Sequence, residues 1–349
     1  MLLYSRRPIA KDLTATSPSS EPVQANPHLR WHPLRGEWVS YASHRNDRTF
    51  LPPAEYNPLA PSRSKEFPTE LPCGDYDIAV FDNRFPSMSA DATDRPALST
   101  QSRPANGICE VVVFTQDPAA SLAGLPLSHF ELLIDVWADR YEEIGARKEI
   151  QYVMPFENRG EEMGVTLNHP HGQIYAYPFV PPVPARELAL QAEYLAKNGR
   201  GLLEDMAAKE LSEGKRLIAS AGSAAAFMPV CARYPYEVWV MPKRPAPSFS
   251  ALNAPERRDF ALTLKTVLMK YDALWNRPFP YLMVFHQAPT DGQPHPEAHL
   301  HAEIYPAFRR PGRLKYLAGT ELGAGMFAND CLPEDKAAEL QAVEVKINE

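Results

Sequence analysis

The stretch Asn168-His169-Pro170-His171-Gly172-Gln173-Ile174-Tyr175-Ala176-Tyr177 is the part of the chain around which the fold is organised. Its second half is apolar and carries two tyrosines, which predicts a β-strand. Side chains alternate between the two faces of a strand, so we expect His169, His171 and Gln173 to point to the same side. Polar side chains on one face of a largely buried strand are costly unless they pair or carry out chemistry. This row is therefore the first candidate for a functional site.

Composition indicates a soluble globular protein. The chain has 349 residues, of which 44% are hydrophobic and 23% charged, and its formal net charge is −7. Such a chain has no general basic field, so we expect neither nucleic acid nor a membrane as partner, and an anionic substrate needs a local basic pocket. The cysteines form no CxxC pair, and no apolar run is long enough for a membrane span or a signal peptide. We therefore expect a cytoplasmic protein.

The same elements recur in the same order in the two halves of the chain, which predicts an internal duplication. Glu110 and Glu237 are separated by nearly the same number of residues as His171 and His301. The expected fold is α+β, with two similar units, each an antiparallel sheet with helices, packed as a pseudo-twofold pair. We expect a flexible arm at residues 1–25, the first unit at 26–184, and a helical insertion, the second unit and a C-terminal helix at 185–349.

Hydrophobic periodicity and turn residues locate the individual elements. The predicted strands lie at 37–41, 76–81, 109–114, 149–156, 168–177, 226–232, 236–241, 281–286 and 298–306, and the predicted helices at 127–145, within 185–215, at 255–274 and at 333–343.

Three roles stay open for the histidines of the first row. A neutral imidazole is a good nucleophile near neutral pH, so His171 could attack phosphorus and form a phosphoramidate. Gly172 would let a phosphate approach the backbone, and Gln173 could hold a phosphoryl oxygen. A His-x-His pair on a strand is equally a metal-ligand arrangement. Two core histidines with satisfied hydrogen bonds would show the same pattern, and the spacing alone does not separate the three.

The second row, His299, His301 and Glu303, is more typical of a metal site because it adds a carboxylate. His286 stands on the neighbouring predicted strand, and Glu187 on the insertion helix is a further candidate ligand. A glutamate on a solvated helix face would have the same sequence pattern as Glu187. Histidine and carboxylate together suit zinc or iron.

Small basic groups follow or precede the two rows. Arg45 and Arg48 lie on one predicted loop, and Arg313 and Lys315 follow the second row. Arginine offers a planar fork for phosphate, although most surface arginines are only solvated. The loop at 157–164 could present backbone N–H groups to a phosphate, and a plain hairpin loop would look alike.

Several segments together resemble the galactose-1-phosphate uridylyltransferases of the histidine-triad superfamily, which contain two fused units. The resemblance extends from about His28 to Val343. It implies the duplicated fold described above and a homodimer. The segments that carry it include Phe156-Glu157-Asn158-Arg159-Gly160, Met163-Gly164, Asn168-His169-Pro170-His171-Gly172-Gln173, Arg30-Trp31-His32-Pro33-Leu34-Arg35-Gly36-Glu37-Trp38 and Lys315-Tyr316-Leu317-Ala318-Gly319-Thr320-Glu321.

The resemblance implies a ping-pong nucleotidyl transfer in galactose metabolism. His171 would attack the α-phosphorus of UDP-glucose, release glucose 1-phosphate and carry a uridylyl group that galactose 1-phosphate then accepts. Gln173 would hold the phosphoryl group without activating water, which favours transfer over hydrolysis. Residues matching the family's nucleotide and phosphate contacts are Arg45, Arg48, Asn83, Asn158, Gly164, Thr166 and Gln173, and those matching its sugar-phosphate contacts are Lys315, Tyr316 and Glu321.

The sequence departs from the family pattern at the first of two metal sites. Asn57 and Ala60 stand at the positions of a zinc-binding CxxC pair, and Pro118 at that of a later histidine. Only His169 of this ligand set remains. We therefore expect this zinc to be absent, and His169 to orient or pack, with a free side chain or a hydrogen bond where the metal would be.

At the second metal site the family's ligands are matched by Glu187, His286 and His301, while Glu303 replaces a histidine and His299 is nearby. We expect at most one divalent ion there, zinc or iron, with a structural role. A competing hypothesis is a metal-dependent enzyme that uses both His-x-His rows as ligands.

The segment that matches the family's sugar site also differs. Thr320 replaces a tyrosine, and residues 323–327 lack an expected glutamine. An adenylyl-transferring enzyme similar to the ADP-glucose phosphorylases, which share the same frame, is therefore the alternative function.

Overall fold

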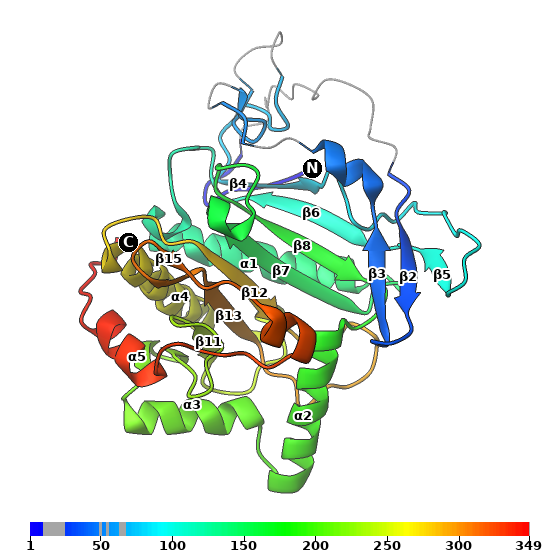
Figure 1. Cartoon of the computed structure of the whole chain (residues 1–349). Helices are drawn as coiled ribbons and strands as arrows, with labels where there is room; N and C mark the ends of the chain where they lie inside the picture. The colour runs from blue at the N-terminus through cyan, green and yellow to red at the C-terminus, as the bar shows by residue number, and fades with distance from the viewer. Residues whose placement is uncertain (10–24, 49–50, 54–55, 63–67, 349) are drawn as a thin grey trace.

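The backbone forms one continuous ten-stranded sheet (Figure 1). The computed structural model describes residues 1–9, 25–48, 51–53, 56–62 and 68–348. All neighbours in the sheet pair antiparallel. In order across the sheet the strands are β1 (Leu2–Tyr4), β4 (Ile78–Asp82), β6 (Ile108–Val113), β8 (His171–Tyr177), β7 (Tyr152–Arg159), β12 (Tyr281–His286), β13 (His301–Pro306), β11 (Val238–Pro242), β10 (Ala224–Phe227) and β9 (Leu217–Ala221).

The strand order is symmetric about the junction between β7 and β12. On one side of it come β8, β6 and β4, and on the other side their sequence counterparts β13, β11 and β10. Tyr281 pairs with Arg159 and Val284 with Phe156, so the sheets of the two units join edge to edge. The predicted α+β fold with two duplicated antiparallel units is confirmed.

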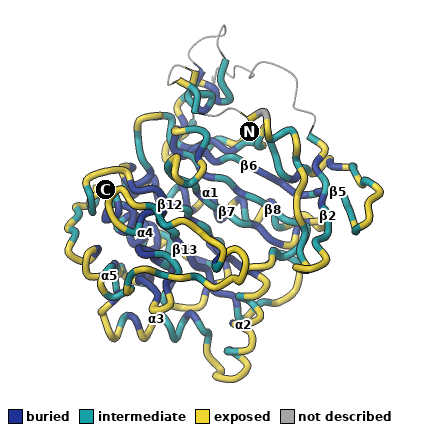
Figure 2. The backbone as a smooth tube through the Cα atoms, in the orientation of Figure 1, coloured by how far each residue is buried: buried dark blue, intermediate teal, exposed yellow. Residues whose placement is uncertain are grey.

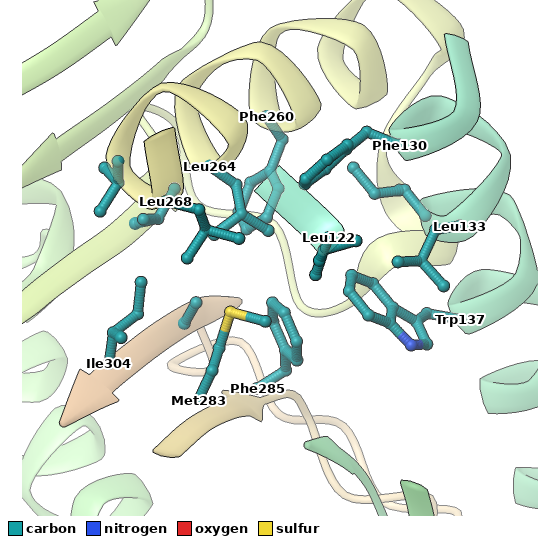
Figure 3. Packing of buried hydrophobic residues seen from close by; sticks show 14 of the residues in the cluster. Leu122, Phe130, Leu133, Trp137, Phe260, Leu264, Leu268, Met283, Phe285 and Ile304 are labelled. Atoms are coloured by element: carbon teal, nitrogen blue, oxygen red, sulfur yellow. The ribbon is translucent and has the colours of Figure 1, made fainter. Parts of the chain in front are cut away.

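Two long helices, α1 (Leu127–Gly145) and α4 (Ala254–Leu274), lie against each other and cover one face of the sheet (Figure 1). Their apolar residues meet the sheet in the main core, where the rings of Trp137 and Phe285 have centroids 4.4 Å apart (Figure 3). None of the helices in the described ranges combines the length and apolar character needed to cross a bilayer.

The opposite face of the sheet carries shorter elements. Leu29 and Trp38 of a small second sheet pack there with Cys109 and Tyr175, which covers one end of β6 and β8. The strands of that sheet are β2 (His28–His32), β3 (Glu37–Tyr41) and β5 (Ser102–Pro104). Figure 2 shows the ten-stranded sheet as mostly buried and α2 as largely exposed.

The remaining elements surround the second unit. Helix α3 packs on β10, and α5 packs on β9 and α4. These elements are α2 (Pro182–Asn198), α3 (Leu202–Glu213), α5 (Pro333–Gln341), the strands β14 (Phe308–Arg310) and β15 (Arg313–Leu314), and the short turns η1 (Ser43–Asp47), η3 (Leu122–Gly124), η4 (Glu161–Met163), η5 (Phe249–Ala251) and η6 (Thr320–Ala324).

The first polar row, His169, His171 and Gln173, does not lie on one strand as expected. Strand β8 begins at His171, so His169 lies before the strand. Its ring is 2% exposed and bonds to groups outside the row, so His169 does not share a face with His171 and Gln173. Proline at position 170 explains the late start, because it has no N–H to donate to a ladder.

Two other expectations need correction. Leu2–Tyr4 forms β1 and pairs with β4, and the Arg6 side chain bonds to Asp77, so the chain up to Arg6 is not a free arm. Residues 10–24 of the expected arm lie outside the described residues. The insertion consists of two helices, of which the first begins at Pro182, and it is followed by the unpredicted strand β9.

Candidate active site

His171 and Gln173 project from β8 to the face of the sheet that lies opposite α1 and α4. Exposure alternates along the strand: His171 and Gln173 are half-buried, whereas Ile174 and Ala176 are buried in the main core. This alternation is the period of two that a strand imposes. The polar row of the sequence is therefore reduced to two side chains, both of which line one pocket.

The tautomer of His171 is fixed by the backbone. Its Nδ1 lies 2.7 Å from the carbonyl oxygen of His169, which can only accept, so Nδ1 donates its hydrogen. The other nitrogen, Nε2, then carries the lone pair, and no group among the described residues bonds to it. Burial lowers the pKa of His171 below its ordinary value, against a smaller opposite effect of this hydrogen bond. A neutral imidazole with a free Nε2 is the nucleophilic form.

Gly172 has a packing role on the other face. A Cβ atom at this position would lie 2.8 Å from Cζ of Phe114 and 2.9 Å from the carbonyl oxygen of Phe156. Any side chain at this position would collide with the core. Glycine is therefore required here by packing, whereas we expected it to admit a phosphate.

The pocket of His171 contains most of the predicted nucleotide contacts. Asn83 donates through Nδ2 to Oε1 of Gln173 over 3.1 Å, and its own Oδ1 accepts from the N–H of Phe85. This bond fixes the orientation of the Gln173 amide, and no described residue accepts a hydrogen bond from its N–H groups, so they can donate into the pocket. The predicted residues that line it are Arg45, Arg48, Asn83, Thr166, His171 and Gln173.

Arg45 is held at the mouth of this pocket. It donates from one terminal nitrogen to the carbonyl oxygen of Phe85 over 2.7 Å and to the Tyr175 hydroxyl over 3.3 Å. Arg48 is exposed and lines the same pocket. Two guanidinium groups beside His171 give this pocket the local positive charge that an anionic substrate needs.

The floor of the pocket is an apolar row that crosses three strands. Phe81 of β4 is paired with Val111 of β6, and Val111 with Gln173 of β8. With strands about 4.8 Å apart, the row extends roughly 10 Å from Gln173 to Phe81. The sequence does not predict the other lining residues. Phe81 and Val111 lie on predicted strands, whose pairing across the sheet is not visible in the sequence, and the rest lie on segments without periodicity. These residues are Pro58, Leu59, Glu70, Phe81, Arg84, Phe85, Val111 and Leu167.

Two predicted contacts do not line the pocket. Asn158 falls at the end of β7, and extending the β7–β8 register by two residues places it opposite His171 on the same face. Gly164 ends the turn η4 with φ +76°, a left-handed conformation that favours glycine.

The predicted sugar-phosphate residues do not line the pocket of His171 in this chain. Nζ of Lys315 lies 3.3 Å from Oε1 of Glu321, and both of these side chains are buried. Tyr316 is 75% exposed. Leu322 and Met326, which follow on the same segment, are also exposed, so this segment presents an apolar surface to its surroundings.

His169 is satisfied by hydrogen bonds. Asn57 donates through Nδ2 to Nδ1 of His169 over 3.0 Å, and Nε2 of His169 donates to the carbonyl oxygen of Thr115 over 2.7 Å. The carbonyl Oδ1 of Asn57 accepts from the N–H of Leu59, which fixes the orientation of the amide. The expected hydrogen bond in place of a metal is confirmed. An amide nitrogen that donates to Nδ1 is no metal ligand, so these residues do not fit the zinc of the family's first site.

Three of the candidate metal ligands come together near the N-terminal end of α2. Glu187, His286 and His301 offer ligand atoms that all lie within 4.8 Å of one another. Oε2 of Glu187 is 2.8 Å from Nδ1 of His286, yet that buried Nδ1 makes no hydrogen bond to a described residue. A buried nitrogen and a carboxylate that face each other without a hydrogen bond suit a shared metal ion, so the residues present fit a divalent cation.

The pKa values of this group follow from burial and charge. Burial lowers the pKa of His301 to about 4, and the positive charge of His286 adds to that effect. Burial also opposes protonation of His286, but the nearby negative carboxylate of Glu187 outweighs it and raises the pKa. His301 therefore offers a neutral imidazole lone pair at neutral pH, which is the form that binds metal.

Glu303 and His299 border this three-membered group, and each also has another partner. Oε1 of Glu303 lies 3.9 Å from Nε2 of His301, the same distance as Oε2 of Glu187, and His299 lines the same small cavity as the three. Glu303 accepts hydrogen bonds from Arg233 over 3.1 Å and from the Tyr305 hydroxyl. Nε2 of His299 donates to the carbonyl oxygen of Pro242. His169 of the first row is satisfied by Asn57 and Thr115, and the one group of metal ligands among the described residues includes His301 of the second row and no residue of the first. The described residues therefore do not support an enzyme that uses both His-x-His rows as metal ligands.

Two family models together match nearly the whole chain. The model described as galactose-1-phosphate uridyl transferase, N-terminal domain, matches residues 18–181, and that of the C-terminal domain matches residues 187–348. The chain is 36% identical over 328 residues to the galactose-1-phosphate uridylyltransferase of Thermotoga maritima, which covers 91% of this chain and 99% of that protein. It is 31% identical over 355 residues to the galactose-1-phosphate uridylyltransferase of Rattus norvegicus, and the match covers 96% of this chain and 91% of that protein.

Solved structures agree with these matches. A uridylyltransferase structure is 33% identical to this chain and superposes with a TM-score of 0.80 over 90% of this chain and 97% of its own. An ADP-glucose phosphorylase from Arabidopsis thaliana is 22% identical with a TM-score of 0.68, covering 91% of this chain and all of its own. At that identity the second likeness concerns the fold alone.

Proposed function

This chain belongs to the galactose-1-phosphate uridylyltransferase family, and we propose that it transfers the uridylyl group of UDP-glucose to galactose 1-phosphate through a covalent bond to His171. The observation that carries the proposal is the hydrogen bond from Nδ1 of His171 to the His169 carbonyl oxygen, which leaves Nε2 as a free nucleophile in a basic pocket. Uridylyl transfer is a step of galactose metabolism.

In the first half-reaction Nε2 of His171 attacks the α-phosphorus of UDP-glucose. The N–P bond forms as the bond from the α-phosphorus to the bridging oxygen breaks, and the electron pair leaves with glucose 1-phosphate. The uridylylated imidazole is positively charged, and its Nδ1–H still donates to the His169 carbonyl oxygen, which stabilises that charge. No proton has to leave the site.

In the second half-reaction a phosphate oxygen of galactose 1-phosphate attacks the same phosphorus. The N–P bond breaks, its electron pair returns to Nε2, and UDP-galactose is released. Gln173 donates to a non-bridging phosphoryl oxygen in both steps, and Arg45 and Arg48 compensate the negative charge. Because an amide does not take up a proton from water, Gln173 favours transfer over hydrolysis.

Glu187, His286 and His301 would hold a single divalent ion, zinc or iron. When bound, it would supply a cross-link rather than a reacting group, since these residues lie outside the pocket of His171. Glu187 belongs to α2, whereas His286 ends β12 and His301 begins β13. The site thus fastens the inserted helix to the sheet.

The enzyme acts as a cytoplasmic homodimer, in which the segment around Tyr316 forms part of the subunit contact. The exposure of Tyr316, Leu322 and Met326 supports this assignment, because an apolar segment beside the sheet is suited to a subunit contact. The units at 26–184 and 185–349 are the two halves of each subunit.

Exchange kinetics test this function. The protein is incubated with UDP-glucose and labelled glucose 1-phosphate, without galactose 1-phosphate, and then with a panel of sugar 1-phosphates. Label should enter UDP-glucose, and galactose 1-phosphate should be the preferred acceptor. Faster exchange between ADP-glucose and glucose 1-phosphate would instead support the adenylyl-transferring alternative, and absence of any exchange would contradict both.

A further inference from the structure

One carboxylate lies among the arginines of the His171 pocket. Oε1 of Glu70 is 3.4 Å from a terminal nitrogen of Arg84, and both residues line the pocket. The Glu70 side chain is only 17% exposed, whereas that of Arg84 is 43% exposed. The N–H of Glu70 donates to the carbonyl oxygen of Pro58, which anchors the backbone at this point.

The ion pair of Glu70 and Arg84 lies beside the position that a bound nucleoside would occupy. The phosphoryl group belongs at His171 and Gln173 on β8, at one end of the apolar floor. The floor continues through Val111 to Phe81 on β4. Arg84 directly follows Asn83, whose side chain donates to Gln173, so Arg84 and its partner Glu70 lie near the phosphoryl position. The ribose is the part of a nucleotide next to the phosphate, so a nucleoside bound along the floor brings its ribose close to this pair.

A carboxylate in a phosphate-binding pocket repels the phosphates unless a cation neutralises it, and it favours binding where it meets a hydrogen-bond donor of the ligand. The base offers a flat apolar face to Phe81 and Val111, and the phosphates offer only acceptors. The ribose 2′- and 3′-hydroxyls are donors, and an acidic side chain is the group that proteins commonly place against them. Arg84 neutralises Glu70 and holds its carboxylate in position.

We infer that Glu70, held by Arg84, accepts hydrogen bonds from the ribose hydroxyls and makes this enzyme select ribonucleotides over 2′-deoxyribonucleotides. The inference rests on the proposed function, because it needs a nucleotide in the pocket of His171. It assigns Glu70 as a specificity-determining residue. A purely structural ion pair between Glu70 and Arg84 would stabilise the loop and would not discriminate between the two sugars.

Binding of UMP and 2′-deoxy-UMP by isothermal titration calorimetry tests the assignment without need for turnover. The wild-type protein should bind UMP roughly 10- to 150-fold more tightly, the range for a hydrogen bond to a charged group. Glu70→Ala should reduce this ratio to about threefold or less, because UMP loses the hydrogen bonds of both hydroxyls whereas 2′-deoxy-UMP loses only that of its 3′-hydroxyl. Glu70→Gln keeps the shape of the side chain and should give an intermediate ratio.

Glu131→Ala is the matched control, because Glu131 also pairs with an arginine, Arg258, on the helical face away from the pocket. It should keep the wild-type ratio. An unchanged ratio in Glu70→Ala, an equal loss for both nucleotides, or no binding of either nucleotide would overturn the inference. A protein that binds with the expected ratio yet shows no exchange from UDP-glucose would contradict the proposed function and leave the ribose assignment standing.

Discussion

The Nδ1 atom of His171 lies 2.7 Å from the carbonyl oxygen of His169, two residues earlier in the chain. The second unit repeats this relationship between His301 and the His299 carbonyl oxygen, at 2.8 Å. The duplicated backbone thus presents two imidazoles with the same free nitrogen. Their surroundings separate the roles: Nε2 of His171 belongs to an arginine-lined pocket, whereas Nε2 of His301 lies 3.9 Å from Glu187.

Replacing Gln173 by alanine should lower kcat for uridylyl transfer by roughly 10²- to 10³-fold with little change in stability, because a donor to the developing phosphoryl charge is lost. Steady-state kinetics with UDP-glucose and galactose 1-phosphate measure this. Asn83→Ala, which removes only the group that orients Gln173, should have a smaller effect. A loss in Asn83→Ala larger than that in Gln173→Ala would contradict the assigned roles.

Activity should fall on the acid side of neutrality as His171 is protonated. Burial lowers the pKa of His171 below the ordinary value of 6.5, so the neutral nucleophile is fully present at pH 7 and above and is lost only at lower pH. The pH profile of kcat/KM should therefore be flat from about pH 8 to 7, with its acid limb below about 6.5. An acid limb centred above pH 7 would mean that the pKa of His171 is raised, and would contradict the effect of burial on His171.

Replacing Asn57 by alanine should destabilise the protein by about 1–3 kcal/mol, because Nδ1 of buried His169 loses its donor. Urea unfolding measures the change in free energy. Asn198→Ala, which removes an exposed side-chain bond to the Tyr194 carbonyl oxygen, is the control and should cost well under half as much. Equal stability of Asn57→Ala and the wild type would mean that this hydrogen bond does not hold His169.

Metal content should be about one ion per chain and should depend on Glu187. Elemental analysis of Glu187→Ala and His301→Ala should find the ion largely lost, together with a lower melting temperature, because α2 is no longer cross-linked to the sheet. His295→Ala is a matched control, since His295 contacts Asp291 and Glu297 on an outlying loop. Two tightly bound ions per chain, or full metal content in Glu187→Ala, would refute the three-ligand site.

Elements with strong periodicity were predictable from the sequence. The apolar spacing within α1 located it at 127–145, and the apolar run from Tyr281 to His286 located β12, both as the structure has them. The duplication was visible because each unit keeps its histidines on equivalent strands. The edge-to-edge junction of β7 and β12 was not predictable, since the sequence of an edge strand and that of a central strand differ little when both faces are covered.

The functional site was predictable where it lies on strands and not where it lies on loops. His171 and Gln173 follow from the alternation of β8. Glu70 and Arg84 were missed because they follow proline-rich or irregular chain, where spacing does not determine which side chains meet. His169 was placed on the wrong face because the strand begins after Pro170 and not before it.

The mass of the intact protein after incubation with UDP-glucose alone tests the central claim most directly. The wild-type chain should gain one uridylyl group, and peptide mapping should locate it on His171. His171→Ala should gain nothing while keeping the wild-type melting temperature, and His295→Ala should be modified like the wild type. A wild-type chain that gains no mass, or carries the uridylyl group on another residue, would contradict the assignment of His171 as the nucleophile.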